Sequence, residues 1–575
     1  MSYKETYLNW LNSPALSQAE KAELQAIAGD EKEIESRFFA PLEFGTAGLR
    51  GTMCVGLHQM NVHVIRHATQ AFAEVILAEG PESARKGVAI CFDCRHHSDE
   101  FAREAARVMA GNGIPVRIFE SLRPTPELSF AIREYGCIAG INVTASHNPK
   151  EYNGYKVYWE DGAQLPPRHA DAIAQKMAEL DLFASPKLAD FEQAMAEGRI
   201  TRMGAETDEA FLAHVMGQVN DQSAVERVAD TFKMVYTPFH GTGYRLIPEV
   251  LRRLGMKHVL CVPEQMVIDG DFPTVASPNP ENPEGFHLAV ALADREGADF
   301  ILGSDPDADR VGLMVRNREG RFVPLSGNQT GVLLLDYLIT AKQRAGTLPA
   351  NAAALKTIVT TEMARKVAEV NGVQMFDTFT GFKFMAEKKN ALEQSGEGKV
   401  LFSYEESYGY MMGDYVRDKD AVTAALVCTE MAAWYYGQGM TLYDAMMGLY
   451  EKYGWYGEKT LNLVMPGLDG LKKMAELMQD LRARPLTEIA GTAVVLRKDY
   501  SDGVQTDVAA GTVAEMELKG SNVLKYKLAD GTDLVVRPSG TEPKVKVYIL
   551  AQGASKAACD ATVAKYAAWA ETLKR

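Results

Sequence analysis

Several features that would narrow the choice of protein class at once are missing from this sequence. No apolar run approaches the roughly 20 consecutive residues that a bilayer-spanning helix needs, which argues against a membrane protein. Only 7 cysteines are scattered through 575 residues, which argues against a disulfide framework and favours a reducing compartment. The first residues, MSYKETYLNWLNSP, lack the basic and then apolar pattern of a secretory leader. We therefore expect a cytoplasmic protein.

Positive charge is also in short supply. There are 61 Lys and Arg residues against 76 Asp and Glu, a formal net charge of −15. Binding along a nucleic-acid backbone depends on many cations, so nucleic acid is not an expected partner. An acidic protein that binds a small anion must concentrate its cations locally. Short loops that carry Arg or Lys are therefore more informative than the totals.

The organisation along the chain is that of a multidomain α/β protein. A domain typically has about 150 residues. We therefore expect four domains, which comprise residues 1–205, 206–320, 321–455 and 456–575. The first three alternate strand and helix patterns, and residues 1–40 look helical. Residues 180–205, rich in charge and alanine, are interpreted as a linker. After about residue 455 we expect helices, then an antiparallel hairpin at the Asp-Gly turn of YKLADGTDLVV. The predicted fold is three mixed α/β-sheet domains and a smaller C-terminal α+β domain around a central cleft.

The loop Val143–Lys150, VTASHNPK, is the first candidate for chemistry. It follows a short apolar run that predicts a buried strand, and it ends at a proline. Open α/β sheets place ligands where strands stop, so Ser146 is a candidate nucleophile. Ten residues further on, Lys156 can return to the same place. The alternative interpretation is an ordinary polar turn.

The acidic loop 305–310, DPDADR, is the second candidate. Asp305, Asp307 and Asp309 follow the apolar run ADFILG. Three carboxylates crowded at a strand end repel each other unless a cation joins them, and such a set suits Mg²⁺ in the company of a phosphate. An EF-hand is excluded, because the glycine and the distal glutamate of that loop are missing. A solvated acidic loop is the alternative.

Two further loops carry binding groups. Residues 537–544, RPSGTEPK, lie between two predicted strands and offer a guanidinium, hydroxyls and backbone N–H groups for an anion. Residues 405–409, EESYG, offer acceptors for sugar hydroxyls. Each has a plain surface turn as its alternative. Nearby cations are expected to assist; these are Lys383, Arg417 and Lys419.

Two weaker patterns also contain residues that could bind a ligand. The glycine-flanked Arg50 of FGTAGLRG either faces a phosphate or is simply solvated. Cys91 and Cys94 form a C-x-x-C followed by two histidines. No second ligand pair with zinc-site spacing follows, so a zinc site is disfavoured. Taken together, a hydroxyl, a cation site, hydroxyl acceptors and an anion clamp indicate phosphoryl transfer through a serine.

The sequence closely resembles the α-D-phosphohexomutase superfamily, and within it the phosphoglucomutase-2-like branch that includes phosphopentomutases. The resemblance covers essentially the whole chain. The motifs that carry it are FGTAGLRG, TASHNPKEYNGYKVYW, GSDPDADR, TGFKFM, EESYGY with VRDKD, and RPSGTEPK.

The resemblance implies that Ser146 carries a phosphoryl group. It also implies that Asp305, Asp307, Asp309 and the phosphoserine hold Mg²⁺. Proton transfer and positioning fall to Lys156, Arg50, His147 and Arg310. The substrate-binding residues it implies are Glu405, Ser407, Lys383, Arg417, Lys419, Arg537, Ser539, Gly540 and Thr541. Glucose 1,6-bisphosphate is the implied primer and intermediate, and a monomer is expected.

We therefore predict an isomerase that interconverts glucose 1-phosphate and glucose 6-phosphate in carbohydrate metabolism. Phosphomannomutase-type members have a histidine two positions after the sugar-loop serine, where this chain has Gly409. That difference weakens a mannose-specific interpretation. Phosphopentomutase and phosphomannomutase activity remain alternatives, because one hydroxyl changes few contacts. A serine-dependent metal phosphatase and a silent sugar-phosphate sensor are less well supported. A hydrolase needs to hold only one end of its substrate, and a sensor need not keep the catalytic groups.

Overall fold

The computed structural model describes residues 2–45, 48–465, 470–539 and 544–574. The chain divides into two compact units, each described by itself below. Unit 1 comprises residues 1–327 and 407–441, and unit 2 comprises residues 328–406 and 442–575. In the described part of the chain, no helix combines the length and the apolar character needed to cross a membrane.

The first sheet of unit 1 has six strands in the order β1-β5-β4-β2-β3-β6. Its strands are β1 (Leu49–Thr52), β2 (Val88–Phe92), β3 (Val116–Phe119), β4 (Ala139–Val143), β5 (Tyr152–Trp159) and β6 (Ile200–Met203). β2, β3, β4 and β6 are parallel, whereas β5 runs antiparallel between β4 and β1. The phosphoserine-loop candidate therefore lies on a strand connection at the carboxyl end of β4.

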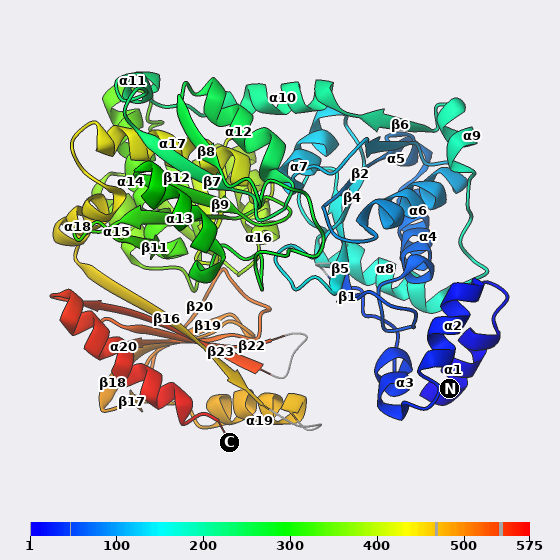
Figure 1. The fold of residues 1–575 in the computed structure, drawn as a ribbon. Coiled ribbons are helices and arrows are strands. Elements are labelled where there is room, and N and C mark those ends of the chain that lie inside the picture. The colour runs from blue at the N-terminus through cyan, green and yellow to red at the C-terminus, as the bar shows by residue number, and fades with distance from the viewer. Residues whose placement is uncertain (1, 46–47, 466–469, 540–543, 575) are drawn as a thin grey trace. The chain divides into compact units, whose positions relative to one another are not determined.

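Helices cover both faces of this sheet (Figure 1). Val88 and Ile90 of β2 pack into the core shared with α4 and α6, whereas Ala89 and Cys91 pack into the core on the α7 side. This alternation follows from the two-residue period of a strand. The helices that accompany this sheet are α1 (Tyr3–Asn12), α2 (Gln18–Ala26), α3 (Glu31–Phe38), α4 (Val62–Ala78), α5 (Pro81–Arg85), α6 (Ser98–Gly111), α7 (Thr125–Glu134), α8 (Pro167–Glu179) and α9 (Phe191–Ala196).

The interpretation of residues 180–205 as a linker is wrong. The stretch forms α9 and then β6, which pairs in parallel with β3, Val116 opposite Ile200. Ile200 and Met203 are buried, while Thr201 and Arg202 between them are exposed. Ile200 and Met203 pack into the cores on opposite faces of the sheet. A four-residue edge strand of this kind shows no two-residue alternation that could stand out from charged surroundings.

The second sheet of unit 1 has five strands in the order β11-β10-β9-β7-β8. They are β7 (Lys233–Thr237), β8 (His258–Cys261), β9 (Phe300–Ser304), β10 (Val311–Arg316) and β11 (Phe322–Leu325). The remaining elements of unit 1 are α10 (Ala205–Met216), α11 (Gln222–Glu226), α12 (Gly243–Arg253), η1 (Pro283–Phe286), α13 (His287–Glu296), β15 (Gly409–Met412) and α17 (Ala421–Tyr436). As predicted, the acidic loop joins two strands, here the antiparallel pair β9 and β10.

Unit 2 contains a parallel arrangement β13-β12-β14. Its strands are β12 (Ala352–Thr357), β13 (Gln374–Thr378) and β14 (Lys399–Glu405), and its helices are α14 (Gly327–Ala345), α15 (Met363–Val370), α16 (Phe382–Ser395) and α18 (Leu442–Tyr453). Gly331 of α14 lies against the ring of Tyr404, where a Cβ would come within 2.1 Å of the ring. The helix can approach the sheet this closely only because residue 331 is glycine.

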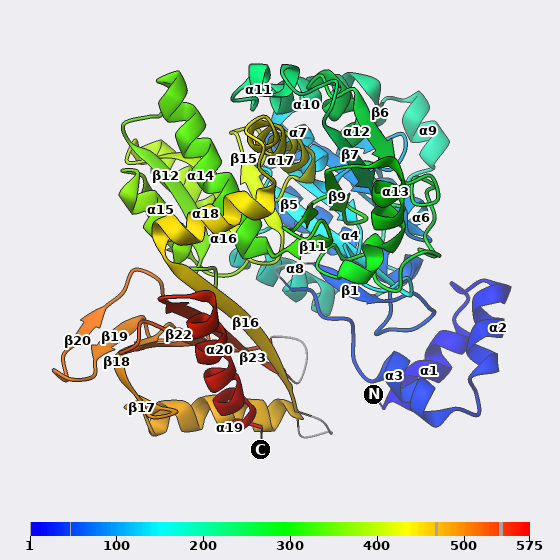
Figure 2. The ribbon, with the colours of Figure 1, turned by 60° about the vertical axis from the view of Figure 1, so that its left-hand side comes forward.

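The C-terminal part of unit 2 is a largely antiparallel sheet in the order β16-β23-β22-β21-β18-β19-β20, with β17 beside β18. The strands are β16 (Trp455–Val464), β17 (Glu488–Ile489), β18 (Thr492–Asp499), β19 (Val504–Asp507), β20 (Val513–Glu515), β21 (Leu524–Leu528), β22 (Asp533–Pro538) and β23 (Lys544–Gly553). α19 (Gly470–Ala483) and α20 (Lys556–Glu571) pack on one face (Figure 2). The predicted hairpin is confirmed as β21 and β22.

A helix follows residue 455 as expected, namely α19, but a strand comes first. Residues 455–464 form β16, which pairs antiparallel with β23 over ten residues, from Trp455 opposite Gly553 to Val464 opposite Lys544. Most β16 side chains are exposed or half-buried, so the stretch carries little alternating hydrophobicity. Its partner lies about ninety residues away in sequence, and that pairing, not local propensity, selects the strand.

Arg123 supplies a stability prediction for unit 1. Its side chain is 1% exposed, and its Nε lies 2.7 Å from Asp208 Oδ1. Arg123→Ala removes one partner of a buried ion pair, so we expect the free energy of unfolding to fall by about 3 kcal/mol. Urea denaturation measures the loss. Arg202→Ala, at an exposed site on β6, should change the free energy by less than about 0.5 kcal/mol. Equal effects of the two variants would contradict the prediction.

Candidate active site

Ser146 lies in a strained turn directly after β4. Its φ is 53°, in the left-handed region that L residues other than Asn and Asp rarely adopt. Its N–H donates to Thr144 Oγ1 at 2.8 Å, and its side chain is nearly buried. The Ser146 hydroxyl donates to Asp305 Oδ2 at 3.0 Å and lies 3.1 Å from His147 Nδ1. The turn therefore presents the hydroxyl to the acidic loop of the second sheet.

Arg95 holds this turn in place, and the sequence analysis did not identify it. The buried guanidinium donates to the carbonyl oxygens of Ser146 at 2.8 Å, of Pro149 at 2.8 Å and of Tyr152 at 3.0 Å. Arg95 follows β2, whose carboxyl end lies beside that of β4. The rule that ligand loops gather at the carboxyl ends of parallel strands could have drawn attention to it.

The three aspartates of the acidic loop converge as expected. Each offers a carboxylate oxygen, and these atoms lie within 4.8 Å of one another. All three side chains are buried. The loop curls because Ala308 has a φ of 50°. It also packs against Gly241, where a Cβ would lie 2.3 Å from Pro306 Cα.

The charges of this cluster are only partly matched by the chain itself. Burial, then the charges of Asp307 and Asp309, raises the pKa of Asp305 well above its usual range. In the described part of the chain, Asp307 Oδ1 and Asp309 Oδ1 are buried and accept no hydrogen bond. Orphaned carboxylate oxygens facing one another are costly without a cation. The donor set, all oxygen, suits a hard divalent ion. The triad could thus hold a metal ion.

Two lysines reach the same cluster from distant parts of unit 1. Lys156, on β5, places its Nζ 2.8 Å from Asp307 Oδ2 and 3.7 Å from Asp309 Oδ2. Lys419 places its Nζ 3.1 Å from Asp309 Oδ2. The return of Lys156 to the serine pocket was expected. The sequence also assigns Lys419 to the sugar loop, and that role stays a prediction; the structure places its amine against the acidic triad.

Lys419 is itself fixed by a buried carboxylate. Asp418 Oδ1 lies 2.9 Å from Lys419 Nζ, and Asp418 Oδ2 accepts a hydrogen bond from the Tyr158 hydroxyl at 2.9 Å. Thr125 makes a second contact that the sequence did not predict. Its hydroxyl donates a hydrogen bond to Asp307 Oδ2 at 2.8 Å. No local pattern marks the Tyr158–Asp418 and Thr125–Asp307 contacts, because each joins residues that are more than a hundred positions apart in sequence.

The other predicted groups of unit 1 lie nearby. Arg310 ion-pairs with Glu281 at 3.0 Å and lies 3.8 Å from Asp309 Oδ1. Arg50, exposed on β1, donates to Asn148 Oδ1 of the serine loop at 2.9 Å. Burial, then the charges of Arg310 and Arg50, lowers the pKa of His147 well below its usual range. His147 is therefore a neutral imidazole beside the serine.

Arg417 and Ser407 also belong to unit 1. Arg417 is buried, and its guanidinium donates to the carbonyl oxygens of Asp414 and Val416, both at 2.9 Å. Its position is set from outside its own loop, since its N–H donates to Ser129 Oγ at 2.8 Å. Ser407 lies in the turn between β14 and β15.

Unit 2 brings the other predicted loops together. Glu405, at the end of β14, accepts the N–H of Gly381 at 2.6 Å through Oε1. Glu406 Oε2 accepts hydrogen bonds from the Thr357 and Thr360 hydroxyls at 3.3 and 3.2 Å. Lys383 follows at the start of α16, and burial lowers its pKa to about 8.

The predicted anion clamp lies on the β22–β23 hairpin. Arg537 is the penultimate residue of β22, and the hairpin is closed by the Ser539 N–H, which donates to the Lys544 carbonyl at 2.8 Å. Buried Tyr548 connects the clamp to the sugar loop. Burial and then the charge of Glu406 raise its pKa, whereas Arg537 lowers it. Gly540 and Thr541, also predicted for the clamp, lie outside the described residues.

Four consecutive family profiles match the chain. They are described as phosphoglucomutase/phosphomannomutase α/β/α domain I over residues 41–183, domain II over 209–320, domain III over 326–453 and C-terminal domain over 462–565.

Curated relatives and solved structures agree with these profiles. A phosphoglucomutase of Staphylococcus epidermidis is 35% identical over 510 residues, which cover 88% of this chain and 90% of the relative. One from Staphylococcus saprophyticus is 33% identical over 518 residues, 90% and 92% of the two chains. The Paramecium phosphoglucomutase parafusin, solved in an open form, superposes with a TM-score of 0.69 at 19% identity, covering 93% of this chain and 95% of its own. A phosphoglucomutase/phosphomannomutase family protein from Burkholderia thailandensis superposes with a TM-score of 0.65 at 18% sequence identity. The match covers 92% of this chain and 97% of that protein. The structural matches bear on the fold alone, and they agree with the predicted arrangement of three α/β sheets and a C-terminal sheet.

Proposed function

Because the chain belongs to the phosphoglucomutase/phosphomannomutase family, we propose that it interconverts glucose 1-phosphate and glucose 6-phosphate. The reaction runs through a phosphoserine at Ser146 and a bisphosphorylated sugar, glucose 1,6-bisphosphate. The division into domains at residues 205, 320 and 455 is part of this proposal, with one functional loop in each domain.

A single observation carries the proposal. A nearly buried serine hydroxyl, held in a strained turn, lies 3.0 Å from a carboxylate of a three-aspartate cluster that two lysines approach. A nucleophile, a set of metal ligands and paired cations at one place are what phosphoryl transfer requires, since it depends on positioning and charge stabilisation. A hydroxyl in a plain polar turn would need none of these neighbours.

The aspartates supply the metal ligands in this proposal. Asp305, Asp307 and Asp309 would hold Mg²⁺, which would offset negative charge on the oxygens of the transferred phosphoryl group. Asp305 also accepts the Ser146 hydroxyl hydrogen bond, so it orients the nucleophile. Lys156 and Lys419 keep the aspartates in place by ion pairs and add positive charge.

Proton movement accompanies each transfer. When a sugar hydroxyl takes the phosphoryl group from Ser146, the sugar O–P bond forms, the serine O–P bond breaks, and the sugar hydroxyl loses its proton. Ser146 Oγ regains a proton. His147 is a neutral imidazole 3.1 Å from that oxygen, and Lys156 is the nearby amine. We assign proton transfer and positioning to these two residues, with Arg50 and Arg310 binding phosphate oxygens.

The loops of unit 2 bind the remainder of the substrate. Sugar hydroxyls are bound by the carboxylate of Glu405, which accepts hydrogen bonds, and by the hydroxyl of Ser407. Arg537 and Ser539 hold the phosphate that is not being transferred, with Gly540 and Thr541 completing that loop. Lys383 and Arg417 add cations for the substrate. Guanidinium groups suit this task because they bind phosphate in a bidentate manner.

Substrate profiling tests the function. We expect kcat/KM with glucose 1-phosphate to exceed the values with mannose 1-phosphate and ribose 1-phosphate, with no release of inorganic phosphate. Preference for ribose 1-phosphate would assign a phosphopentomutase by the same chemistry. Steady phosphate release would assign a phosphatase and overturn the proposal.

Arg537→Ala should act mainly on binding. A charge-assisted hydrogen bond contributes roughly 1.5–3 kcal/mol, so we expect KM for glucose 1-phosphate to rise roughly 10- to 100-fold. The effect on kcat should be smaller. Arg484→Ala, at an exposed arginine of unit 2, is the matched control and should leave steady-state kinetics unchanged. Wild-type kinetics for Arg537→Ala would remove this residue from the site.

The lowered pKa of Lys383 predicts that kcat/KM depends on pH. Its pKa is lowered to about 8 by burial, so in the free enzyme the amine loses its charge as pH rises through about 8. If the charged form binds phosphate, kcat/KM should fall across that pH range, since this ratio reports the free enzyme. Lys383→Arg, which stays charged, should remove this fall. A profile of kcat/KM that is identical in the two proteins would contradict the assignment.

A further inference from the structure

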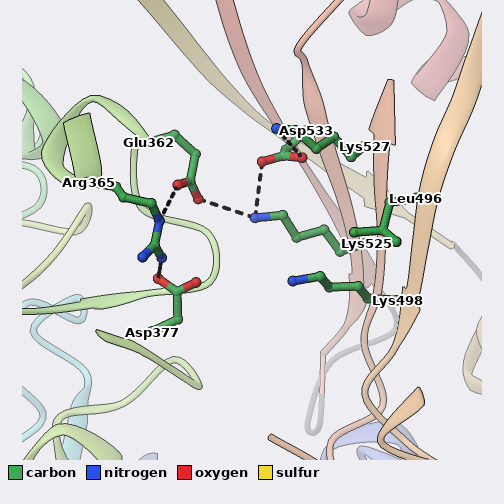
Figure 3. A pocket seen from close by; sticks show the side chains of 8 residues that line it. All are labelled: Glu362, Arg365, Asp377, Leu496, Lys498, Lys525, Lys527 and Asp533. Atoms are coloured by element: carbon green, nitrogen blue, oxygen red, sulfur yellow. Dashed lines mark hydrogen bonds and ion pairs between the residues drawn. The ribbon is translucent and has the colours of Figure 1, made fainter. Parts of the chain in front are cut away.

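Unit 2 contains a cavity of about 430 Å³, and none of the residues that line it is assigned above to the reaction. On one side it is lined by Glu362, Arg365 and Asp377, from α15 and its neighbouring loop and strand (Figure 3). On the other side its lining comes from strands β18, β21 and β22. We call it the lysine cavity, because Lys498, Lys525 and Lys527 all face it.

Most charges around the lysine cavity are matched in pairs. Glu362 ion-pairs with Arg365 at 3.0 Å and with Lys525 at 3.4 Å. Asp377 lies 2.7 Å from Arg365. Asp533 lies 3.2 Å from Lys525 and 3.6 Å from Lys527. The carboxylates of the lining are therefore already engaged by other cations.

Lys498, in contrast to these paired side chains, has no partner for its charge among the described residues. No hydrogen bond or ion pair joins its amine to another residue of the described chain, and Figure 3 shows the amine extending from β18 into the cavity. In the sheet, Lys498 lies directly opposite Lys525 on the antiparallel strand β21. Like charges at directly opposed positions are unfavourable. Burial, and then the charge of Lys525, lowers the pKa of Lys498.

Lys525 cannot relieve this repulsion by losing its own proton. Its side chain is nearly buried, and although burial acts to lower its pKa, Asp533 and Glu362 raise it. It therefore stays charged. The positive charge of Lys498 thus faces a solvent-accessible space beside a second, permanently charged lysine. An anion bound in that space would form an ion pair with the Lys498 amine and would stabilise its charged form.

We propose that the lysine cavity is a second ligand site, which binds the phosphate group of a small metabolite. Lys498 and Lys527 contact the phosphate oxygens, and the carboxylates of Glu362 and Asp377 accept hydrogen bonds from hydroxyls of the same molecule. Lysine amines bind tetrahedral phosphate as point charges. The cavity volume falls within the range of small-ligand sites, and none of its lining residues is assigned to catalysis.

The test uses a background in which the proposed catalytic site is disabled, the full-length Ser146→Ala/Arg537→Ala protein. Inorganic phosphate and sn-glycerol 3-phosphate are titrated into it by calorimetry. We expect one site, and we expect Lys498→Met in this background to weaken binding roughly tenfold or more, the worth of one charge-assisted contact. Lys498→Arg should stay within a few-fold of the background. Lys459→Met, at an exposed strand lysine outside the cavity, should not change the affinity.

The two probes distinguish the sources of the phosphate. Tighter binding of sn-glycerol 3-phosphate supports a hydroxylated phosphomonoester, and equal binding supports free phosphate as the ligand. No binding to the background protein, or the same affinity with Lys498→Met, would overturn the proposal. If Lys498→Met does not fold, Lys527→Met, at a side chain about half exposed, gives a second reading with the same expected direction. Because mutase activity is not measured, failure here is distinguishable from failure of the proposed reaction.

Discussion

Ser146→Ala is expected to lower kcat by at least about 10⁴-fold, the scale of removing a covalent nucleophile. The variant keeps the acidic triad, both lysines and the sugar loop, so affinity for glucose 1-phosphate should stay within a few-fold of wild type. In the proposed reaction the Ser146 hydroxyl carries the phosphoryl group, and no other described hydroxyl donates to Asp305. Steady-state kinetics and calorimetry measure the two quantities.

Ser146→Gly separates the hydroxyl from the backbone strain. Glycine adopts a φ of 53° without strain, so this variant should be at least as stable as Ser146→Ala and equally inactive. Intact mass should show one phosphoryl group on wild type after incubation with glucose 1,6-bisphosphate and none on either variant. Mutase turnover close to wild type in either variant would exclude the phosphoserine route.

Asp307→Asn is expected to have the second-largest effect. The asparagine keeps an acceptor for the Thr125 hydroxyl and for Lys156, which lie 2.8 Å from Asp307 Oδ2. It removes one negative charge from the triad. Changes around metal ligands cost about 10- to 100-fold in metal affinity even when they affect only the supporting residues. We therefore expect Mg²⁺ affinity to fall by at least roughly 100-fold, with a comparable loss of kcat/KM at low Mg²⁺.

Two measurements separate metal binding from folding. Calorimetric titration of Mg²⁺ into wild type and Asp307→Asn reports the affinity without turnover, and the loss of activity should be partly reversed at high Mg²⁺. Asp171→Asn, at an exposed position of α8, is the control and should match wild type in both. Unchanged Mg²⁺ affinity in Asp307→Asn would remove Asp307 from the metal site.

The proposed functional loops could be found in the sequence because their signals are local. The aspartates at 305, 307 and 309 follow an apolar strand directly, and a curled loop of that spacing brings alternate carboxylates together whatever the remainder of the chain does. The same holds for Ser146, at the end of β4. The glycine and proline residues around these motifs mark strand ends within a few positions.

The positions of the supporting cations could not be found in this way. Lys419 sits two residues after Arg417, and proximity in sequence suggested a shared sugar-binding role. In the fold, its amine contacts Asp309, more than a hundred residues earlier. Arg95 and Asp418 likewise act through partners supplied by other strands and loops. Such contacts depend on which elements become neighbours, and a single sequence does not report that.

The sequence alone thus determined the candidate groups for the chemistry and the class of fold that presents them, because motif spacing and hydrophobic period act over a few residues. Only the tertiary structure decided how those groups are oriented and charged. It recruited β6 and β16 into sheets against their weak local patterns. It also set Lys498 opposite Lys525. The physical reason is that pairing between distant strands and burial of charge depend on the whole fold, whereas propensity and turn chemistry do not.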